Sequence, residues 1–261
     1  MTRRPVLALC LALAAAPALA GPAELDILPG WRTAEGTQMA AIRVQLDPGW
    51  KTYWRAPGDA GIPPEFTWEG SSNLASVAFH WPTPELFATN GMTSIGYHDQ
   101  LILPVELTPR DPARPIRLRG RADIGVCSDI CVPFSADFAA DLDGTADHQD
   151  ARIAASLRAV PTSARAAGVG RVTCTLAPER NGYVLSTSVA MPPAGRGEFA
   201  VIELPGLPVW VSEARTTRQG DRLDATVDVV PEPGQPLALD RSKVRITVLA
   251  GGNAVEIRGC S

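Results

Sequence analysis

Two cysteines four positions apart, Cys127 and Cys131, are the residues of this chain best suited to chemistry. They enclose three residues, and Pro133 follows almost at once. Cysteines at this spacing can meet across a turn or a distorted hairpin, at the Cα separation of about 4.4–6.8 Å that a disulfide needs. A loop this small adds little stability in the chain-entropy model, and strained or exposed bridges are the more easily reduced ones. The spacing leaves both a structural staple and an exchangeable redox bridge open.

A metal site is the third interpretation of this pair. Two thiolates can bind a soft ion such as Cu(I) or Zn(II), but a closed zinc site needs two further ligands. The candidates elsewhere in the chain are His80, His98 and His148, with Met92 for copper. None of them lies at a recognisable ligand spacing from the cysteines, so we predict no metal and no cofactor.

A second pair, Cys174 and Cys260, spans nearly all of the second half of the chain. Val172, Cys174 and Leu176 fall on one face of a predicted strand, which directs Cys174 towards a core. A bridge to Cys260 would pin the last strand to the first strand of the same domain, and closing so long a loop contributes about 4 kcal/mol in the entropy model. We predict a structural disulfide; a second exchangeable pair or two free thiols are the alternatives.

The fifth cysteine, Cys10, lies in a predicted secretory signal over residues 1–20. Arg3 and Arg4 precede an apolar stretch, and Ala18-Leu19-Ala20 is a small-x-small cleavage site. The stretch is too short for a comfortable membrane span, although an uncleaved anchor is the alternative. Cleavage after Ala20 removes Cys10, and export places the other four cysteines where disulfides persist. No later stretch is long and apolar enough to cross a membrane, so no membrane insertion is predicted after cleavage.

The composition limits both the fold and the partners. The 261 residues are 45% hydrophobic and include 24 Pro and 23 Gly, which disfavours a helical bundle and suits many short strands joined by turns. Only 6% of the residues are aromatic and the formal charge is −4, so binding of nucleic acid by phosphate neutralisation is excluded. We therefore predict an all-β protein.

The elements that must position the cysteines follow from apolar runs, period-2 alternation and Pro/Gly turns. The predicted strands of the first half are 40–46, 74–79, 101–107, 116–122 and 135–142. Those of the second half are 172–176, 183–189, 199–204, 209–213, 222–229, 243–248 and 254–257. This density in the second half is typical of an immunoglobulin-like β-sandwich.

A short helix is predicted between the two halves, within residues 147–158. Ile153, Ala154 and Leu157 form one apolar face, Thr145 or Asp147 caps the start, and Pro161 ends it. We accordingly divide the chain into a signal peptide (1–20), a first domain with the close cysteine pair (21–144), a connector helix and linker (145–168) and a second β-sandwich domain (169–261).

The first half resembles the N-terminal periplasmic domain of the DsbD/ScsB thiol:disulfide interchange proteins. The segment Gly125-Val126-Cys127-Ser128-Asp129-Ile130-Cys131-Val132-Pro133 carries the resemblance, together with the earlier strand Pro48-Gly49-Trp50-Lys51-Thr52-Tyr53-Trp54. Gly61-Ile62-Pro63-Pro64, Trp81-Pro82-Thr83-Pro84, Gly96-Tyr97-His98 and Leu103-Pro104-Val105 follow in the same order. The resemblance covers about residues 25–142, and the second half is similar, more loosely, to the extra β-domain of ScsB-like members.

The resemblance implies an immunoglobulin-like first domain whose cysteine pair carries reducing equivalents in the periplasm. Cys127 and Cys131 match the redox cysteines; by analogy Cys131 forms the mixed disulfide with a partner and Cys127 resolves it. The family's cap loop, with an aromatic residue that shields the pair, would fall within residues 84–91, with Phe87 as the shield or else a plain packing residue. The implied partners are periplasmic thiol-disulfide proteins, either a thioredoxin-like donor or a client.

The chain departs from full-length relatives in having no membrane domain and no thioredoxin-like Cys-x-x-Cys. We therefore expect the membrane electron donor to be a separate protein. Two hypotheses remain open. One is a periplasmic disulfide carrier or protein-disulfide reductase that works by dithiol–disulfide exchange at Cys127 and Cys131. The other is a non-catalytic β-sandwich binding module, in copper tolerance for example, whose disulfides are all structural.

The two acidic residues near the pair, Asp123 and Asp129, have two interpretations. A carboxylate close to a cysteine would raise the pKa of its thiol and make it a sluggish nucleophile until a partner docks. Turn chemistry explains the same residue types and is the interpretation we prefer. Among the aromatic residues of the early strand, Trp50, Tyr53 and Trp54 are expected in the core, with lining of the site as the alternative.

Overall fold

A computed structural model of the protein describes residues 21–89, 91–144, 148–235 and 237–261. The predicted signal segment 1–20, with Cys10, lies outside these residues, and so do Thr145 and Asp147, the two predicted caps of the connector helix. In the part of the chain that is described, no helix combines the length and the apolar character of a membrane span.

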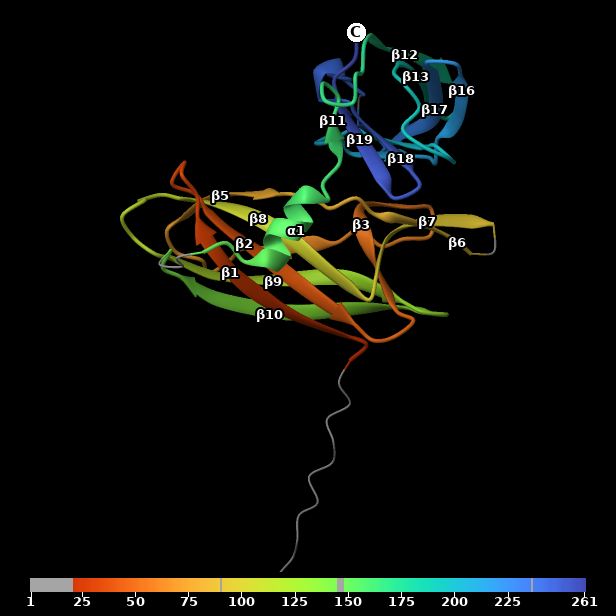
Figure 1. The fold of residues 1–261 in the computed structure, drawn as a ribbon. Helices are drawn as coiled ribbons and strands as arrows, with labels where there is room; N and C mark the ends of the chain where they lie inside the picture. The colour runs from red at the N-terminus through yellow and green to blue at the C-terminus, as the bar shows by residue number, and fades with distance from the viewer. Residues whose placement is uncertain (1–20, 90, 145–147, 236) are drawn as a thin grey trace, which may run out of the picture.

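The described residues form two immunoglobulin-like β-sandwiches, which confirms the predicted all-β fold class (Figure 1). In the first half, a sheet of order β1-β2-β8-β5 faces a sheet of order β10-β9-β3-β7-β6, with β4 also paired to β9. The strands are β1 (Ala23–Arg32), β2 (Gln38–Leu46), β3 (Lys51–Gly58), β4 (Glu65–Thr67), β5 (Leu74–Phe79), β6 (Glu85–Thr89), β7 (Met92–His98), β8 (Gln100–Pro109), β9 (Ile116–Cys127) and β10 (Cys131–Leu142).

The first core lies between these two sheets, and a helix covers the outer face of one of them. Ala40, Ile42 and Val44 of β2 face the core, as the alternation of a strand dictates. The opposite face of β2 would meet water, but α1 (Ala151–Arg158) packs on it and buries Ile153 against Met39. The Ser156 hydroxyl donates to the carbonyl oxygen of Ile102 at 2.6 Å, so the helix is fixed to the sheet.

The helix begins later than the sequence predicted. Its first residue is Ala151, and the N-cap is Asp150, whose carboxylate accepts from the backbone N–H groups of Arg152 and Ile153. A short acidic side chain in an extended conformation is a strongly preferred N-cap. The helix ends at Arg158, before Pro161, as expected.

In the second half, a sheet of order β11-β19-β18-β14 faces a sheet of order β12-β13-β17-β15, with β16 also paired to β17. Leu223, Ala225 and Val227 are buried in alternation along β17, as its period-2 pattern predicted. The strands are β11 (Thr162–Ser163), β12 (Val172–Glu179), β13 (Gly182–Ala190), β14 (Phe199–Glu203), β15 (Val209–Val211), β16 (Arg215–Gln219), β17 (Arg222–Pro231), β18 (Arg245–Ala250) and β19 (Asn253–Arg258), and a 3-10 turn η1 covers Arg241–Lys243.

Strand β18 departs from its predicted half-buried pattern. Thr247, on the face expected to meet solvent, is buried, and so is Leu249, one residue beyond the predicted strand. The reason is that β18 and β19 lie against the first sandwich near β3 (Figure 1), where Leu249 joins the first core and the Arg55 guanidinium of β3 reaches Glu256 of β19 at 2.9 Å. The domain boundaries given above stay a prediction.

Candidate functional site

The close cysteine pair lies at the tip of the β9–β10 hairpin. Cys127 is the last residue of β9 and Cys131 the first of β10, and the two are direct partners in the antiparallel register. They are joined by a disulfide with a Cα–Cα distance of 4.1 Å. The hairpin thus realises one of the two local geometries that the spacing predicted. Pro133 is accommodated because β10 is the edge strand of its sheet, where a missing N–H is tolerated.

The two sulfur-bearing residues differ sharply in exposure. Cys127 is buried, with 5% of its surface exposed, whereas Cys131 is exposed. The three tip residues between them are exposed as well, and Ile130 shows 68% of its surface to solvent. A thiolate that approaches from solvent therefore meets Cys131 first, with an apolar side chain beside it.

Tyr53 of β3 lies directly beneath the outer cysteine. Its hydroxyl is 3.1 Å from the Cys131 Sγ and 3.5 Å from the carbonyl oxygen of Ala60. Burial raises the pKa of Tyr53 above its ordinary value, so the hydroxyl stays protonated at neutral pH. Because thiolates only accept, this hydroxyl can donate to a thiolate at Cys131.

Gly125 leaves the space that Tyr53 occupies. A Cβ built on Gly125 would lie 2.7 Å from the Cβ of Ile62 and 3.0 Å from the Tyr53 ring. Glycine is therefore needed here because of close approach, since its φ is not in the left-handed region. Of the three early aromatic residues, Trp54 is fully buried in the first core and Trp50 packs against it, as expected, while Tyr53 is the one that reaches the site.

The same sheet face carries Lys51 of the neighbouring strand β3, which is half-buried. In the register, Lys51 is the partner of Cys127 on one side and of His98 on the other. Its Nζ donates to the Ser94 hydroxyl at 3.2 Å and lies 4.9 Å from the centre of the Phe87 ring. Sequence reasoning missed Lys51 and Ser94 as site residues, because only the register of β3 between β9 and β7 brings them together.

Phe87, the predicted shield, lies in β6, so the predicted cap loop is largely an edge strand paired to β7. Phe87 is the partner of Ser94, and its ring meets His98 edge-on at 6.4 Å between centroids. His98 in turn is paired with Glu85 at 2.9 Å and with Asp99 at 3.3 Å. Phe87 is half-buried on the disulfide's side of the sheet. That it shields the bridge stays a prediction.

The two acidic residues near the pair occupy different places. Asp123 accepts from the Ser135 hydroxyl and from Arg121, and these contacts lower the pKa of its carboxyl. Its charge is therefore engaged four residue pairs along the hairpin from the disulfide. Asp129 lies exposed at the hairpin tip, next to the cysteines in sequence.

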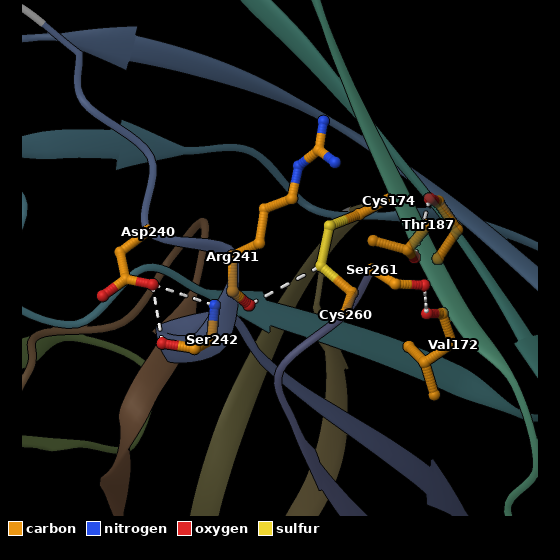
Figure 2. Close-up of a disulfide and its surroundings, with 9 residues drawn as sticks. Val172, Cys174, Thr187, Asp240, Arg241, Ser242, Cys260 and Ser261 are labelled. Atoms are coloured by element: carbon orange, nitrogen blue, oxygen red, sulfur yellow. Dashed lines mark hydrogen bonds between the residues drawn. A yellow bond between two sulfur atoms is a disulfide. The ribbon is translucent and has the colours of Figure 1, made fainter.

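The second cysteine pair forms a disulfide within the second sandwich, with a Cα–Cα distance of 5.7 Å (Figure 2). Cys174 is buried in the core beside Val172 and Leu176. Backbone hydrogen bonds also attach the chain end to β12. The backbone N–H of Cys174 donates to the Ser261 carbonyl oxygen at 3.1 Å, and the backbone N–H of Ser261 donates to the Val172 carbonyl oxygen at 3.0 Å. This bridge ties the segment after β19 to β12.

The described residues contain no group of three or more His, Cys, Asp or Glu side chains that could hold a metal ion. The histidines considered as ligands have other partners or places. His80 pairs with Glu106 on the opposite sheet at 3.1 Å, His98 belongs to the cluster with Glu85, and His148 precedes α1.

A cleft of about 730 Å³ lies between the two sandwiches. The segment from Arg55 to Pro63 forms one wall, and β14 and β15 form the other, with the exposed Trp210 among its lining residues. The same segment covers Tyr53 on its far side, through Ala60 and Ile62. The cleft and the disulfide therefore share one stretch of chain.

Comparisons with known proteins agree with this geometry. Residues 24–143 match the family model of the thiol:disulfide interchange protein DsbD, N-terminal. A solved structure, the N-terminal periplasmic domain of ScsB from Proteus mirabilis, is similar over 95% of this chain and 97% of that chain, with 24% identity and a TM-score of 0.68. No curated protein matches the chain.

Residues 24–143 thus form a domain of the DsbD N-terminal type, which belongs to the thiol:disulfide interchange class. The likeness to the ScsB structure extends over both sandwiches and concerns the fold.

Proposed function

We propose that this protein is a periplasmic thiol:disulfide interchange protein that passes reducing equivalents through Cys127 and Cys131. The observation that carries the proposal is the asymmetric bridge at a hairpin tip, with Cys131 exposed, Cys127 buried and the Tyr53 hydroxyl on the outer sulfur. An exposed bridge of this kind is open to thiolate attack, whereas a structural bridge is protected by burial. The family of residues 24–143 and the periplasmic origin of the similar ScsB structure support it.

The exchange runs in two displacements. A partner thiolate attacks the Cys131 sulfur, a new partner–Cys131 bond forms, and Cys127 leaves as a thiolate with the electron pair of the old bond. The second thiolate of the same partner then attacks the partner sulfur of the mixed disulfide, and Cys131 leaves as a thiolate. The partner now holds a disulfide, and this protein is reduced. In the opposite direction, the Cys131 thiolate attacks a client disulfide and Cys127 resolves the mixed disulfide, which restores the bridge.

The partners are proposed to be thiol-disulfide proteins of the periplasm, with a separate membrane protein as the ultimate electron donor. In this scheme Cys174–Cys260 is a structural bridge. Cys174 is buried, Cys260 is half-buried, and the bridge ties the chain end to β12, which supports a structural role.

Equilibration with glutathione buffers of graded ratio tests the proposal, with alkylation of free thiols and mass measurement of each cysteine. We expect the 127–131 bridge to open and close with the buffer while 174–260 stays closed. Equal resistance of both bridges to the buffers would sink the carrier function and favour a module whose disulfides are all structural.

A matched pair of variants tests which sulfur meets the partner. Cys127→Ser keeps the exposed thiol and is expected to trap a covalent partner from periplasmic extract. Cys131→Ser keeps only the buried thiol and is expected to trap none. Equal trapping by both variants, or trapping by Cys131→Ser alone, would overturn the assigned roles.

A further inference from the structure

Lys51 occupies a position that the exchange chemistry described above leaves without a role. It lies in β3, between β9 and β7, and its direct partner in β9 is Cys127. Directly paired residues of an antiparallel sheet point to the same face, with Cβ atoms about 4.5–5.5 Å apart. The stem of Lys51 therefore starts beside the inner sulfur, on the face that also carries Cys131, Tyr53 and Phe87.

The ammonium group of Lys51 has only neutral partners in the oxidised protein. Nζ donates to the Ser94 hydroxyl and lies over the Phe87 ring. Across the described ranges, no carboxylate forms an ion pair with it; Glu85 of β6 and Asp99, which follows β7, are both paired with His98. The site thus holds one half-buried positive charge with no anion while the bridge is closed.

We propose that Lys51 is the counter-ion of the Cys127 thiolate, and that its ammonium group leaves Ser94 and the Phe87 ring for this sulfur when the bridge opens. The inference rests on the proposed exchange function. When a partner thiolate bonds to Cys131, the S–S electron pair departs with Cys127, and a full negative charge appears beside the Lys51 stem. A charge-assisted contact to that thiolate is stronger than contacts to a hydroxyl and a ring.

Other charged groups around Cys127 do not offer this compensation. His98 is on the far side of Lys51, between Glu85 and Asp99. Asp129 at the tip would oppose a thiolate, and Arg121 is engaged with Asp123 and Asp137 on the outer part of the hairpin. The Tyr53 hydroxyl is directed to the other sulfur, Cys131. Lys51 is the cation whose register places it at the inner sulfur.

The move of Lys51 also changes the contacts of the predicted shield. Phe87 loses the cation over its ring when the ammonium group turns to Cys127.

The thiol pKa of Cys127 tests the inference directly. It is measured from the ultraviolet absorbance of the thiolate against pH in full-length Cys131→Ser protein, with and without a change at Lys51. Lys51→Met keeps the stem but removes the charge, and we expect it to raise the pKa of Cys127 by about one unit, because an opposite charge at close range shifts a pKa by about 1–3 units. Lys51→Arg is expected to restore most of the shift.

A rate measurement on the intact bridge gives a second readout. Reduction of the 127–131 bridge by dithiothreitol at neutral pH is expected to be about threefold slower in Lys51→Met, since a leaving thiolate of higher pKa departs more slowly. Phe87→Leu removes the competing ring and keeps the charge, so the pKa of Cys127 is expected to fall or to stay the same. A rise in Phe87→Leu equal to that in Lys51→Met would assign the effect to packing and overturn the inference.

Failure of this inference and failure of the exchange function are distinguishable. If the wild-type bridge does not open in glutathione buffers, the exchange function is wrong. If it opens, and the pKa of Cys127 is the same in the protein with Lys51 and in the Lys51→Met and Lys51→Arg variants, only the role of Lys51 is wrong.

Discussion

The two sulfur atoms of the hairpin bridge have different neighbours, and this difference makes them chemically distinct. Cys131 has the Tyr53 hydroxyl at 3.1 Å and faces solvent, while Cys127 is enclosed by the sheet with Lys51 as its cross-strand partner. Stabilisation of a thiolate by a hydrogen-bond donor lowers its pKa, and so does a nearby cation. Each sulfur therefore has its own neighbouring side chain on β3, Tyr53 for Cys131 and Lys51 for Cys127.

Removal of the Tyr53 hydroxyl tests whether this group stabilises a thiolate at Cys131. Tyr53→Phe keeps the ring against Gly125, so we expect a loss in the free energy of unfolding of only about 1 kcal/mol. In the Cys127→Ser background the pKa of the Cys131 thiol should rise by about half a unit to one unit, because the thiolate loses a donor that stays protonated at neutral pH. The alkylation rate of Cys131 against pH measures it.

Tyr183→Phe, a change in the second sandwich, is the control for this measurement and should leave the Cys131 titration unchanged. If the pKa of Cys131 is the same in Cys127→Ser protein with and without Tyr53→Phe, the hydroxyl has no influence on the thiolate.

The elements that hold these residues were only partly predictable from the sequence. Strands with unbroken apolar or alternating patterns, such as β5, β8 and β17, were found because burial on one face writes a period of two into the chain. β1 was missed because Pro29 and Gly30 interrupt it at a register shift, where Gly30 adopts a φ of 63°. β6 was taken as a loop because the family resemblance places a cap loop within residues 84–91.

The site shows the same limit. The cysteine pair was recognisable from residue type and spacing, which are local features. Lys51 and Tyr53 reach the pair across strands that are distant in sequence, and the cross-strand register that brings them there depends on the packing of the whole sheet. The family resemblance indicated the strand that carries them but not which side chain reaches which sulfur.

The connector helix begins at one side-chain cap, Asp150. Because the carboxyl group of this residue is ionisable, its contribution to stability is expected to depend on pH. Asp150 is held by the Arg152 side chain and by two backbone N–H groups of the first turn, and these contacts lower its pKa from 3.8 to about 2. Asp150→Ala is expected to reduce the free energy of unfolding by about 1 kcal/mol at neutral pH. The lowered pKa means that this contribution is present above about pH 3.8 and is lost as the pH falls through about 2.

Chemical denaturation of the two proteins between pH 6 and pH 2 measures this, and the curves of variant and wild type should converge at the acid end. Arg152→Ala is the matched control, because it removes the ion pair of the cap residue but leaves both backbone contacts in place. A variant whose deficit is constant down to the lowest pH would contradict the assigned role of the Asp150 carboxylate.

At the scale of the whole molecule, one arginine connects the strand of the redox site to the second sandwich. Arg55 of β3 binds Glu203 of β14 at 3.0 Å and Glu256 of β19 at 2.9 Å, and its guanidinium stacks on Trp54 at 4.1 Å from the ring centre. The three charged side chains are only 13%, 15% and 17% exposed, so solvent screens them weakly. Tyr53 lies two residues from Arg55 on β3, so the second sandwich is bound to the strand that carries Tyr53 to the site.

Replacement of Arg55 tests this connection. Arg55→Met keeps most of the stem over Trp54 but leaves Glu203 and Glu256 without their shared cation, and we expect the free energy of unfolding to fall by about 1–3 kcal/mol. Burial raises the pKa of Glu256, and the guanidinium groups of Arg258, Arg55 and Arg245 more than offset this, so its pKa is lowered in the wild type. Loss of Arg55 moves that pKa upward, so the ionised Glu256 contributes less stability in the variant. The difference in the free energy of unfolding between variant and wild type should therefore be largest at neutral pH and shrink as the solution is acidified through the wild-type pKa of Glu256.

The control for Arg55→Met is Arg258→Ala, which removes a 72% exposed partner of the same Glu256 from within the second sandwich and should cost less than about 1 kcal/mol. Small-angle scattering supplies the geometric readout: Arg55→Met should increase the radius of gyration if the two sandwiches separate, whereas Arg258→Ala should not. Because β3 also carries Tyr53, the same variant is expected to change the exchange rate of the 127–131 bridge. Wild-type scattering together with a wild-type exchange rate in Arg55→Met would mean that the second sandwich and the redox hairpin behave independently.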